Sequence, residues 1–146
     1  MLIGESEGLT EWLNEQGIDP RDLTKRYDNN DTALHIASRK GNARAVRWLI
    51  EMGADVNAAN LDGNPPMWHA CFAGSEEIVR DLAAAGADVN QVNDNHTTSL
   101  MYCSSSGRES MVKLLIDLGA DKSLENLDGY TALDHATTYT MVKMLK

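Results

Sequence analysis

The stretch GADVN occupies residues 53–57, and the same five letters return at residues 86–90. A third version, GADKS, follows at residues 119–123, so that the three copies are evenly spaced along the chain. A glycine before a short polar turn ends a helix well, because glycine takes a positive φ without strain. A fixed period of roughly 20–50 residues is typical of repeat proteins, in which each unit packs on its neighbours. The stretch therefore predicts a chain of stacked units.

Upstream of each turn lies a stretch that predicts a short inner helix. TALHIAS at residues 32–38 has counterparts at 65–71, 98–104 and 131–137, which follow one another at the same period as the turns. In three of the four copies a threonine stands where its hydroxyl can cap the first turn. In the remaining copy Pro66 takes the first helical position, where its missing N–H is harmless. A glycine at 41, 74 or 107 is expected to end the helix.

Apolar residues three and four positions apart predict a longer outer helix after each inner one. Val46, Leu49 and Ile50 have counterparts one and two periods later, and this spacing places an apolar stripe along one side of a helix. No unit can bury its stripe alone, so the expected fold is an all-α solenoid of stacked helix-turn-helix units with projecting loops. The outer helices are expected over 43–52, 76–85 and 109–118.

TALHIA at residues 32–37 and the two GADVN loops resemble the ankyrin repeat, whose units begin on the pattern T-P-L-H-x-A. The resemblance implies a curved stack of L-shaped helix pairs that binds other proteins along its concave inner-helix face and its loop tips. It implies a non-enzymatic interaction module, an adaptor or an inhibitor. The single domain, 1–146, then divides into a half-unit cap at 1–26, repeats at 27–58, 59–91 and 92–124, and a short capping repeat at 125–146.

Both ends of the chain depart from the period. Trp12 and Gly17 echo Trp48 and Gly53 at a spacing longer than the period, which predicts three extra residues around 20–22 after a single capping helix. MVKMLK at the C-terminus echoes MVKLLI at a spacing shorter than the period, so the preceding turn lacks three residues. Thr140 stands where a stop glycine would fall, and the last helix is expected to be short.

Charge and composition exclude several classes of function. The net charge is −9 with no basic stripe, which disfavours nucleic acid as a partner. No stretch approaches the roughly 18 apolar residues of a membrane span, and the two cysteines form neither a disulfide framework nor a zinc motif. We expect a soluble protein without a cofactor, monomeric when free, in the cytoplasm or the nucleus.

His69 and Cys71 pose the alternative of an enzyme, as base and nucleophile or as metal ligands. Both residues also fit repeated columns of the inner helix, which explains them without chemistry. A catalytic or metal site needs a third convergent group. Because His35, His96 and His135 belong to other repeats, we expect nothing to bring the histidines together and assign no catalytic or metal-binding residue.

The inner helices offer a candidate binding patch. Trp68 and Phe72 form an i, i+4 aromatic pair, Met101 extends that face into the next repeat, and Arg39 with Lys40 adds positive charge. Such a patch would suit a partner segment with an apolar anchor and an acidic flank. Two interpretations of Trp68 and Met101 stay open, namely partial exposure as a binding patch and packing between repeats.

The loop tips are acidic or polar, with Asp31 and Asp62 among their acids and Tyr130 as their aromatic residue. They would steer a basic partner, or their Asp and Asn residues serve turn chemistry alone. A scaffold without a specific partner, structural or designed, is a further alternative. The expected partner-binding residues are Trp68, Phe72, Met101, Arg39, Lys40, Asp31, Asp62 and Tyr130.

Asn57 and Asn90 each end a stretch that resembles the site modified by asparaginyl hydroxylases in animal ankyrin repeats. The alternative is that each side chain closes the loop between repeats by hydrogen bonding. The sequence favours the loop-closing role over modification.

Overall fold

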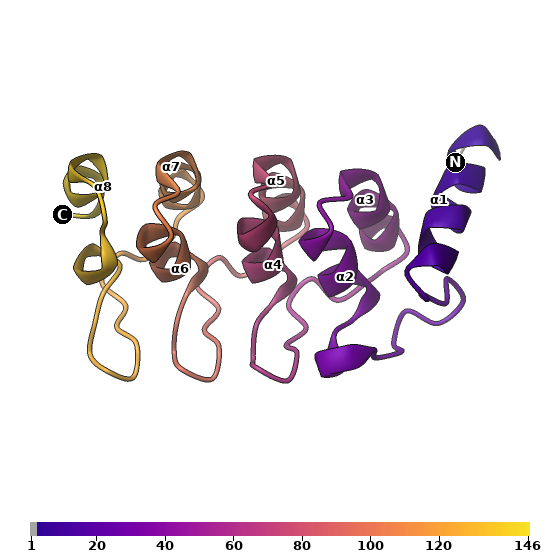
Figure 1. The fold of residues 1–146 in the computed structure, drawn as a ribbon, viewed down its shortest axis with the longest axis horizontal. Helices are drawn as coiled ribbons and strands as arrows, with labels where there is room; N and C mark the ends of the chain where they lie inside the picture. Colours follow the sequence, from indigo (N-terminus) through magenta and orange to yellow (C-terminus); the bar gives the residue numbers. More distant parts are fainter. Residues whose placement is uncertain (1–2) are drawn as a thin grey trace.

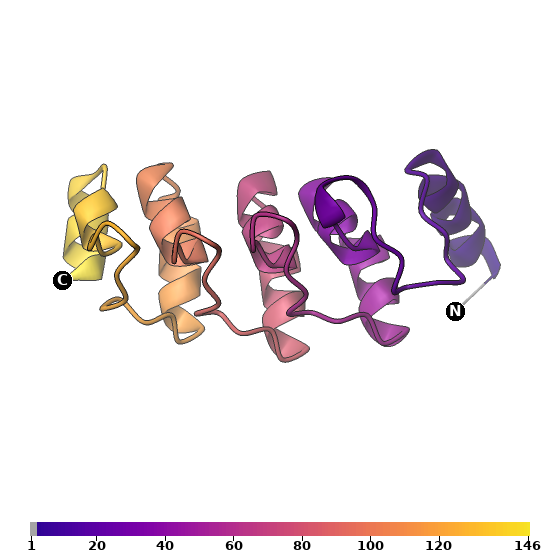
Figure 2. The same cartoon turned by 90° about the horizontal axis from the view of Figure 1, so that it is seen from below.

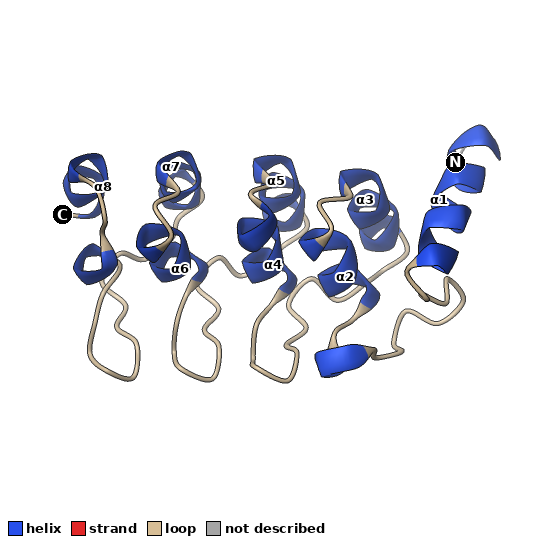
Figure 3. Cartoon of the chain, in the orientation of Figure 1, coloured by secondary structure: helices blue, strands red, loops and turns tan. Residues whose placement is uncertain are grey.

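The computed structural model describes residues 3–146, which form a single row of helix pairs (Figure 1). Within that range the chain has helices and loops and no strand (Figure 3), which confirms the all-α prediction. The two ends of the chain lie at opposite ends of the row (Figure 1). The elements are α1 (Ile3–Glu15), η1 (Asp28–Asn30), α2 (Ala33–Arg39), α3 (Ala43–Glu51), α4 (Pro66–Ala73), α5 (Glu76–Ala84), α6 (Ser99–Ser105), α7 (Glu109–Asp117), η2 (Leu133–His135) and α8 (Tyr139–Leu145).

The inner helices α2, α4 and α6 begin and end as their sequence signals predict. The hydroxyls of Thr32 and Thr98 each accept a hydrogen bond from the backbone N–H three residues on, at 3.2 Å. Pro66 is the first residue of α4. Gly74 ends α4 with a φ of +74°, and a Cβ at this position would lie 2.7 Å from Nη1 of Arg108. A larger residue at 74 would therefore suffer both strain and a close contact.

The outer helices α3, α5 and α7 match the predicted spans to within one residue. Their apolar stripes pack against the inner helices and the neighbouring units, and Val46, Val79 and Leu82 are fully buried. Asn42 and Ser75 cap α3 and α5 with their side chains. Arg108 holds the same position before α7 without a capping bond. It instead donates to the Phe72 carbonyl at 3.0 Å and so ties the third repeat to the end of α4.

One column of the inner helix holds a matched pair of buried hydroxyls. Ser38 and Ser104 are both fully buried, and Ser104 donates to the Ala132 carbonyl of the next unit at 2.7 Å. Within residues 3–146, the Ser38 hydroxyl has no hydrogen-bond partner. A buried polar group without a partner costs about 1–3 kcal/mol, whereas a made bond contributes about 1 kcal/mol.

We therefore expect opposite effects when the two serines are replaced by alanine. Ser38→Ala should raise the free energy of unfolding by about 1 kcal/mol, because it removes a group that has lost water and gained no partner. Ser104→Ala should lower it by a similar amount, because a bond between repeats is lost. Urea denaturation followed by circular dichroism measures both. A loss of stability in Ser38→Ala equal to that in Ser104→Ala would contradict this account.

Four loops, here called fingers 1 to 4, project from the inner helices to the same side of the row and lie nearly parallel (Figures 1 and 2). Each finger is closed at its base by a backbone bond from residue i to the carbonyl of residue i+4, as from Asn60 to Asn64 at 3.1 Å. Backbone bonds also join each finger to the next, from Leu61 to Asn29, from Asp94 to Asp62 and from Leu127 to Asn95. The fingertips are residues 28–31, 61–64, 94–97 and 127–130.

The ends of the row are modified units. The N-terminal unit is the single helix α1, and Pro20 lies in a bend that follows Gly17, where the sequence predicts extra residues. In the C-terminal unit the inner helix shrinks to the three residues of η2, and α8 follows after Thr138, whose side chain caps it. The described residues contain no helix with the length and apolar character to cross a bilayer.

Candidate functional site

Two rows of exposed residues run along the same side of the molecule. One row is formed by the fingertips and the other by the residues at the C-terminal ends of the inner helices, such as the half-buried Arg39 and the exposed Lys40. In the first repeat the two rows meet around a hollow of about 250 Å³, which Asp28 of finger 1 lines together with Ile36, Arg39 and Lys40. The later fingers and inner helices follow in the same arrangement along the row (Figure 1). We call these two rows and the space between them the inner face.

Arg39 does not offer a free positive charge to this face. Its Nη1 donates to Oδ2 of Asp31 at 2.6 Å. The side chain of Asp31 is 3% exposed and that of Arg39 is 36% exposed. The prediction that Asp31 is a surface acid at a loop tip is therefore wrong. Its carboxylate turns inward from finger 1 and holds the finger against α2.

Burial raises the pKa of Asp31, but hydrogen bonds from Arg39 and Asn60 outweigh it and leave the pKa below the usual 3.8. Asn60 Nδ2 donates to Oδ1 of Asp31 at 2.9 Å. The amide orientation of Asn60 is fixed, because its Oδ1 accepts the backbone N–H groups of Asp62 and Asn64 at 3.0 Å each. Asp31 is thus a buried carboxylate paired on both oxygens.

Two histidines join this cluster, so the prediction that nothing brings histidines together is wrong. The rings of His35 and His69 meet edge to face, with 5.3 Å between centroids. The Thr32 backbone N–H donates to His35 Nδ1 at 3.0 Å, which leaves Nε2–H to donate to the Asn64 carbonyl at 2.8 Å. His69 Nε2 accepts from Asn60 Nδ2 at 3.2 Å. Both rings are therefore neutral and of defined tautomer.

Burial is the main cause that lowers the pKa of both histidines. For His69 the neighbouring His35 lowers it further, the Asp31 carboxylate opposes the shift, and the pKa falls to about 4. His69 Nε2 lies 3.8 Å from Oδ1 of Asp31. The histidines are thus held uncharged at neutral pH as part of the packed stack.

The cluster does not fit a metal ion, although Asp31, His35 and His69 place possible ligand atoms within 4.8 Å of one another. Both Asp31 oxygens, both His35 nitrogens and Nε2 of His69 already hold protein partners at 3.2 Å or less. The Arg39 guanidinium on Asp31 also opposes a second cation. The arrangement instead fastens finger 1, finger 2 and two inner helices together.

The thiols offer no accessible nucleophile. Cys71 and Cys103 are free and fully buried, and they stand on α4 and α6, which pack together. The neighbouring Cys71 thiol and burial raise the pKa of Cys103 far above its usual value. A reactive cysteine needs an exposed thiolate. The pair is therefore part of the apolar contact between repeats.

The predicted aromatic patch divides between core and surface. Met101 is 1% exposed, so the expectation that it extends an exposed face is wrong. Trp68 is partly buried and lies against Tyr102 of the next repeat, with 4.7 Å between ring centroids. Phe72 is 54% exposed at the C-terminal end of α4. Packing between repeats thus explains the burial of Met101 and the partial burial of Trp68. Phe72 is the member of the predicted patch that remains exposed on the inner face.

Three fingers are shaped by asparagines that the sequence analysis did not single out. Asn60, Asn93 and Asn126 each use the side-chain oxygen to accept the backbone N–H groups two and four residues on, at 2.9–3.0 Å. Their recurrence at the period of the repeat was the signal that could have found them. Tyr27 stands at this position in finger 1.

Asn57 and Asn90 join neighbouring loops at the other edge of the row. Asn57 Oδ1 accepts the backbone N–H of Asp88 at 2.8 Å, and Asn90 Oδ1 accepts that of Asp121 at 2.7 Å. These bonds confirm the loop-closing interpretation of both side chains. Thr24 is the equivalent residue one unit earlier, and its hydroxyl donates to Asp22 instead.

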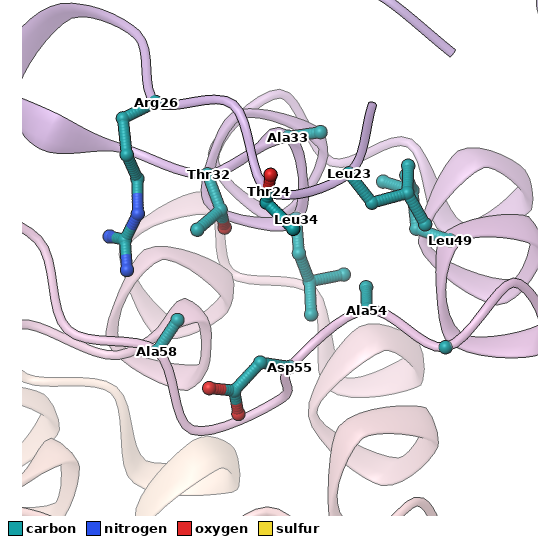
Figure 4. Close-up of a pocket in the computed structure, with 11 residues that line it drawn as sticks. Leu23, Thr24, Arg26, Thr32, Ala33, Leu34, Leu49, Ala54, Asp55 and Ala58 are labelled. Carbon is teal, nitrogen blue, oxygen red and sulfur yellow. The ribbon is translucent and has the colours of Figure 1, made fainter. Parts of the chain in front are cut away.

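A cavity of about 250 Å³ lies at this junction between the N-terminal unit and the first repeat (Figure 4). Leu34, Ala54 and Ala58 line it together with Thr24 and Asp55. One repeat later, Gln91 stands at the position of Ala58 and donates to the Asn57 carbonyl at 3.0 Å. The smaller side chains of the first junction therefore explain the space without a ligand.

Comparisons with known proteins agree with this architecture. A family model described as ankyrin repeats (3 copies) matches residues 1–93 and 82–146. The chain is 36% identical over 67 residues to protein phosphatase 1 regulatory subunit 12A of Mus musculus, which covers 46% of this chain and 6% of that protein. It is 41% identical over 59 residues to regulatory protein SWI6 of Kluyveromyces lactis, which covers 40% of this chain and 8% of that protein.

A shorter relative is the Notch-regulated ankyrin repeat-containing protein of Homo sapiens. The two are 40% identical over 47 residues, which covers 32% of this chain and 41% of that protein. In each of these relatives the matched part is less than half of the protein's length.

Proposed function

Because the chain belongs to the ankyrin repeat family, whose repeats generally mediate contacts between proteins, we propose that it binds a partner protein through the inner face and is not an enzyme. The observation that carries the proposal is the exposure of Phe72 on the inner face. This side chain is 54% exposed and lies at the C-terminal end of α4, in the helix-end row. Aromatic residues, phenylalanine among them, are enriched at protein interfaces, where a few anchors carry most of the binding energy.

The fingers support this proposal through their rigidity. Each finger is closed at its base and bonded to the next finger through the backbone. The buried pair of Asp31 with Arg39 fixes finger 1 to α2. A surface that is ordered before binding loses little conformational entropy when a partner docks. The net charge of −9 further favours a protein partner over nucleic acid.

The proposal predicts the effect of removing Phe72. Proteins captured by the wild-type chain from the native organism would be tested against Phe72→Ala, and affinity should fall about thirtyfold, or about 2 kcal/mol. The matched control is Arg80→Ala on α5, whose side chain is 60% exposed and outside the inner face. The melting temperature of both variants should stay near that of the wild type. An unchanged affinity in Phe72→Ala would contradict the proposal.

A further inference from the structure

The fingertips form one rigid acidic row. Asp28, Asp62, Asp94 and Asp128 are exposed, one in each finger, and no lysine or arginine stands in any fingertip. The backbone N–H of Asp94 donates to the Asp62 carbonyl at 3.1 Å, so these two acids lie side by side on adjacent fingers. Asn29 Nδ2 also holds Oδ2 of Asp62 at 2.9 Å. The backbones that carry these acids are therefore held to one another, and the carboxylate of Asp62 is held as well.

Beyond the first repeat the helix-end row opposite has no charged residue of its own. Within the described part of the chain, the one cation that the structure places against it is Arg108, whose guanidinium is bonded to the Phe72 carbonyl at 3.0 Å. In the second and third repeats its residues are Phe72, Ala73, Ser105 and Ser106, all of them exposed. The exposed apolar side chains Leu61 and Leu127 flank the acids on the fingertips. Over the second and third repeats the inner face thus combines an acidic row of fingertips with a helix-end row of uncharged residues, in which Phe72 is the exposed aromatic residue and Arg108 is held on its carbonyl.

The positive charge of the first repeat does not cancel this acidity. Arg39 is already paired with the buried Asp31 carboxylate at 2.6 Å. Lys40 is the remaining basic residue of the helix-end row, and it lies against finger 1 at the N-terminal end of the face. A cationic partner would therefore favour the second to fourth repeats and avoid this end. This favours the basic partner suggested by the loop tips over the acidic flank suggested by the inner-helix patch.

We infer that the partner docks as a basic segment of protein chain, with lysine or arginine side chains toward Asp62, Asp94 and Asp128 and an apolar side chain against Phe72. This inference rests on the proposed function and adds the chemistry of the occupant. Opposite charges accelerate encounter and fix the register of the complex, while the apolar anchor supplies affinity. The small side chains of Ser105 and Ser106 leave room for the segment to continue past the anchor.

A phage-displayed library of random dodecapeptides is a direct probe of this chemistry. We expect selection on the wild-type chain to enrich peptides that combine at least two lysine or arginine residues with a leucine or an aromatic residue. The triple variant Asp62→Asn, Asp94→Asn, Asp128→Asn keeps the shape of each side chain and removes three charges. Selected peptides should bind it about tenfold more weakly at low salt, and raising the salt should shrink that difference.

A second triple variant provides the matched control. Glu51→Gln, Glu77→Gln and Asp117→Asn remove the same charge from exposed positions on the outer helices, and peptide affinity should change less than twofold. If both triple variants weakened peptide binding equally, the effect would follow from the net charge of the protein and not from the fingertips. That result would overturn the inference.

Two other outcomes separate the inference from the proposed function. The selection could instead enrich neutral or acidic peptides that bind Phe72→Ala more weakly but bind the fingertip triple variant normally. That result would overturn the inference that the occupant is basic, and the inner face would remain the binding site. Failure to enrich any peptide would overturn a linear segment as the occupant. The proposed function is tested separately, by the affinity of Phe72→Ala for the captured partner, whichever peptides are selected.

Discussion

Leu82→Ala is expected to lower the free energy of unfolding by about 2–5 kcal/mol, the range for truncating a large apolar side chain in a packed core. Leu82 lies on α5 in the middle of the row and is fully buried. Its loss opens a cavity between units that depend on one another for burial. Urea denaturation followed by circular dichroism measures the change, which should appear without loss of the helical spectrum at low urea.

The control for Leu82→Ala stands on the same helix. Arg80 has a side chain that is 60% exposed and lies 3.8 Å from Glu76, so Arg80→Ala should cost less than about 0.5 kcal/mol. A cost for Leu82→Ala below about 1 kcal/mol would mean that the middle repeats are not packed as a stack.

Acid should destabilise the protein between pH 6.5 and about 4, and His69 should cause a large share of the effect. The pKa of folded His69 is lowered from 6.5 to about 4 by burial and by His35. Between these pH values His69 is protonated in the unfolded chain and neutral in the folded chain. The free energy of unfolding therefore falls as the pH falls, and the contribution of His69 is complete only above pH 6.5. A pKa lowered to about 4 corresponds to about 3 kcal/mol at most.

The matched variant is His69→Gln, whose amide oxygen can still accept from Asn60 and does not titrate. Its free energy of unfolding should fall less than that of the wild type between pH 7 and pH 4.5. His35 keeps a residual dependence of the same sign, because its pKa is also lowered. The lowered pKa of Asp31 adds a loss only below its usual 3.8. Equal acid sensitivity in variant and wild type would exclude His69 as a cause.

The helices could be predicted from the sequence because their signals are local. A capping threonine, a stop glycine and an apolar stripe act within one helix, and the fixed period of the chain repeats each signal. The outer helices were accordingly placed to within one residue. The short η2 was less predictable, because the missing three residues of the last unit only showed that its turn was altered.

The site was predicted in part, because exposure depends on the neighbouring unit. Met101 and Trp68 share a column of the repeat, but Met101 is 1% exposed, whereas Trp68 is only partly buried and lies against Tyr102 of the next repeat. His35 and His69 seemed distant in sequence. Stacking brings residues about one period apart into contact, so a spacing this close to the period was itself a signal.

Asp31 was misassigned for a related reason. It ends a run of acids and asparagines whose first three members are exposed, and only the partners Arg39 and Asn60 draw its carboxylate inward. Such a pairing spans 29 residues in the case of Asn60. The exposed fingertip acids Asp28, Asp62, Asp94 and Asp128 stay at the surface, where they define the charge of the inner face.

The central claim, that a partner protein covers the inner face, is tested most directly by hydroxyl-radical footprinting of the captured complex. Phe72 and Met52 are 54% and 57% exposed, and Met52 follows the outer helix α3. The account predicts that partner binding lowers the oxidation rate of Phe72 several-fold and leaves that of Met52 unchanged. Protection of Met52 with an unchanged rate at Phe72 would contradict it.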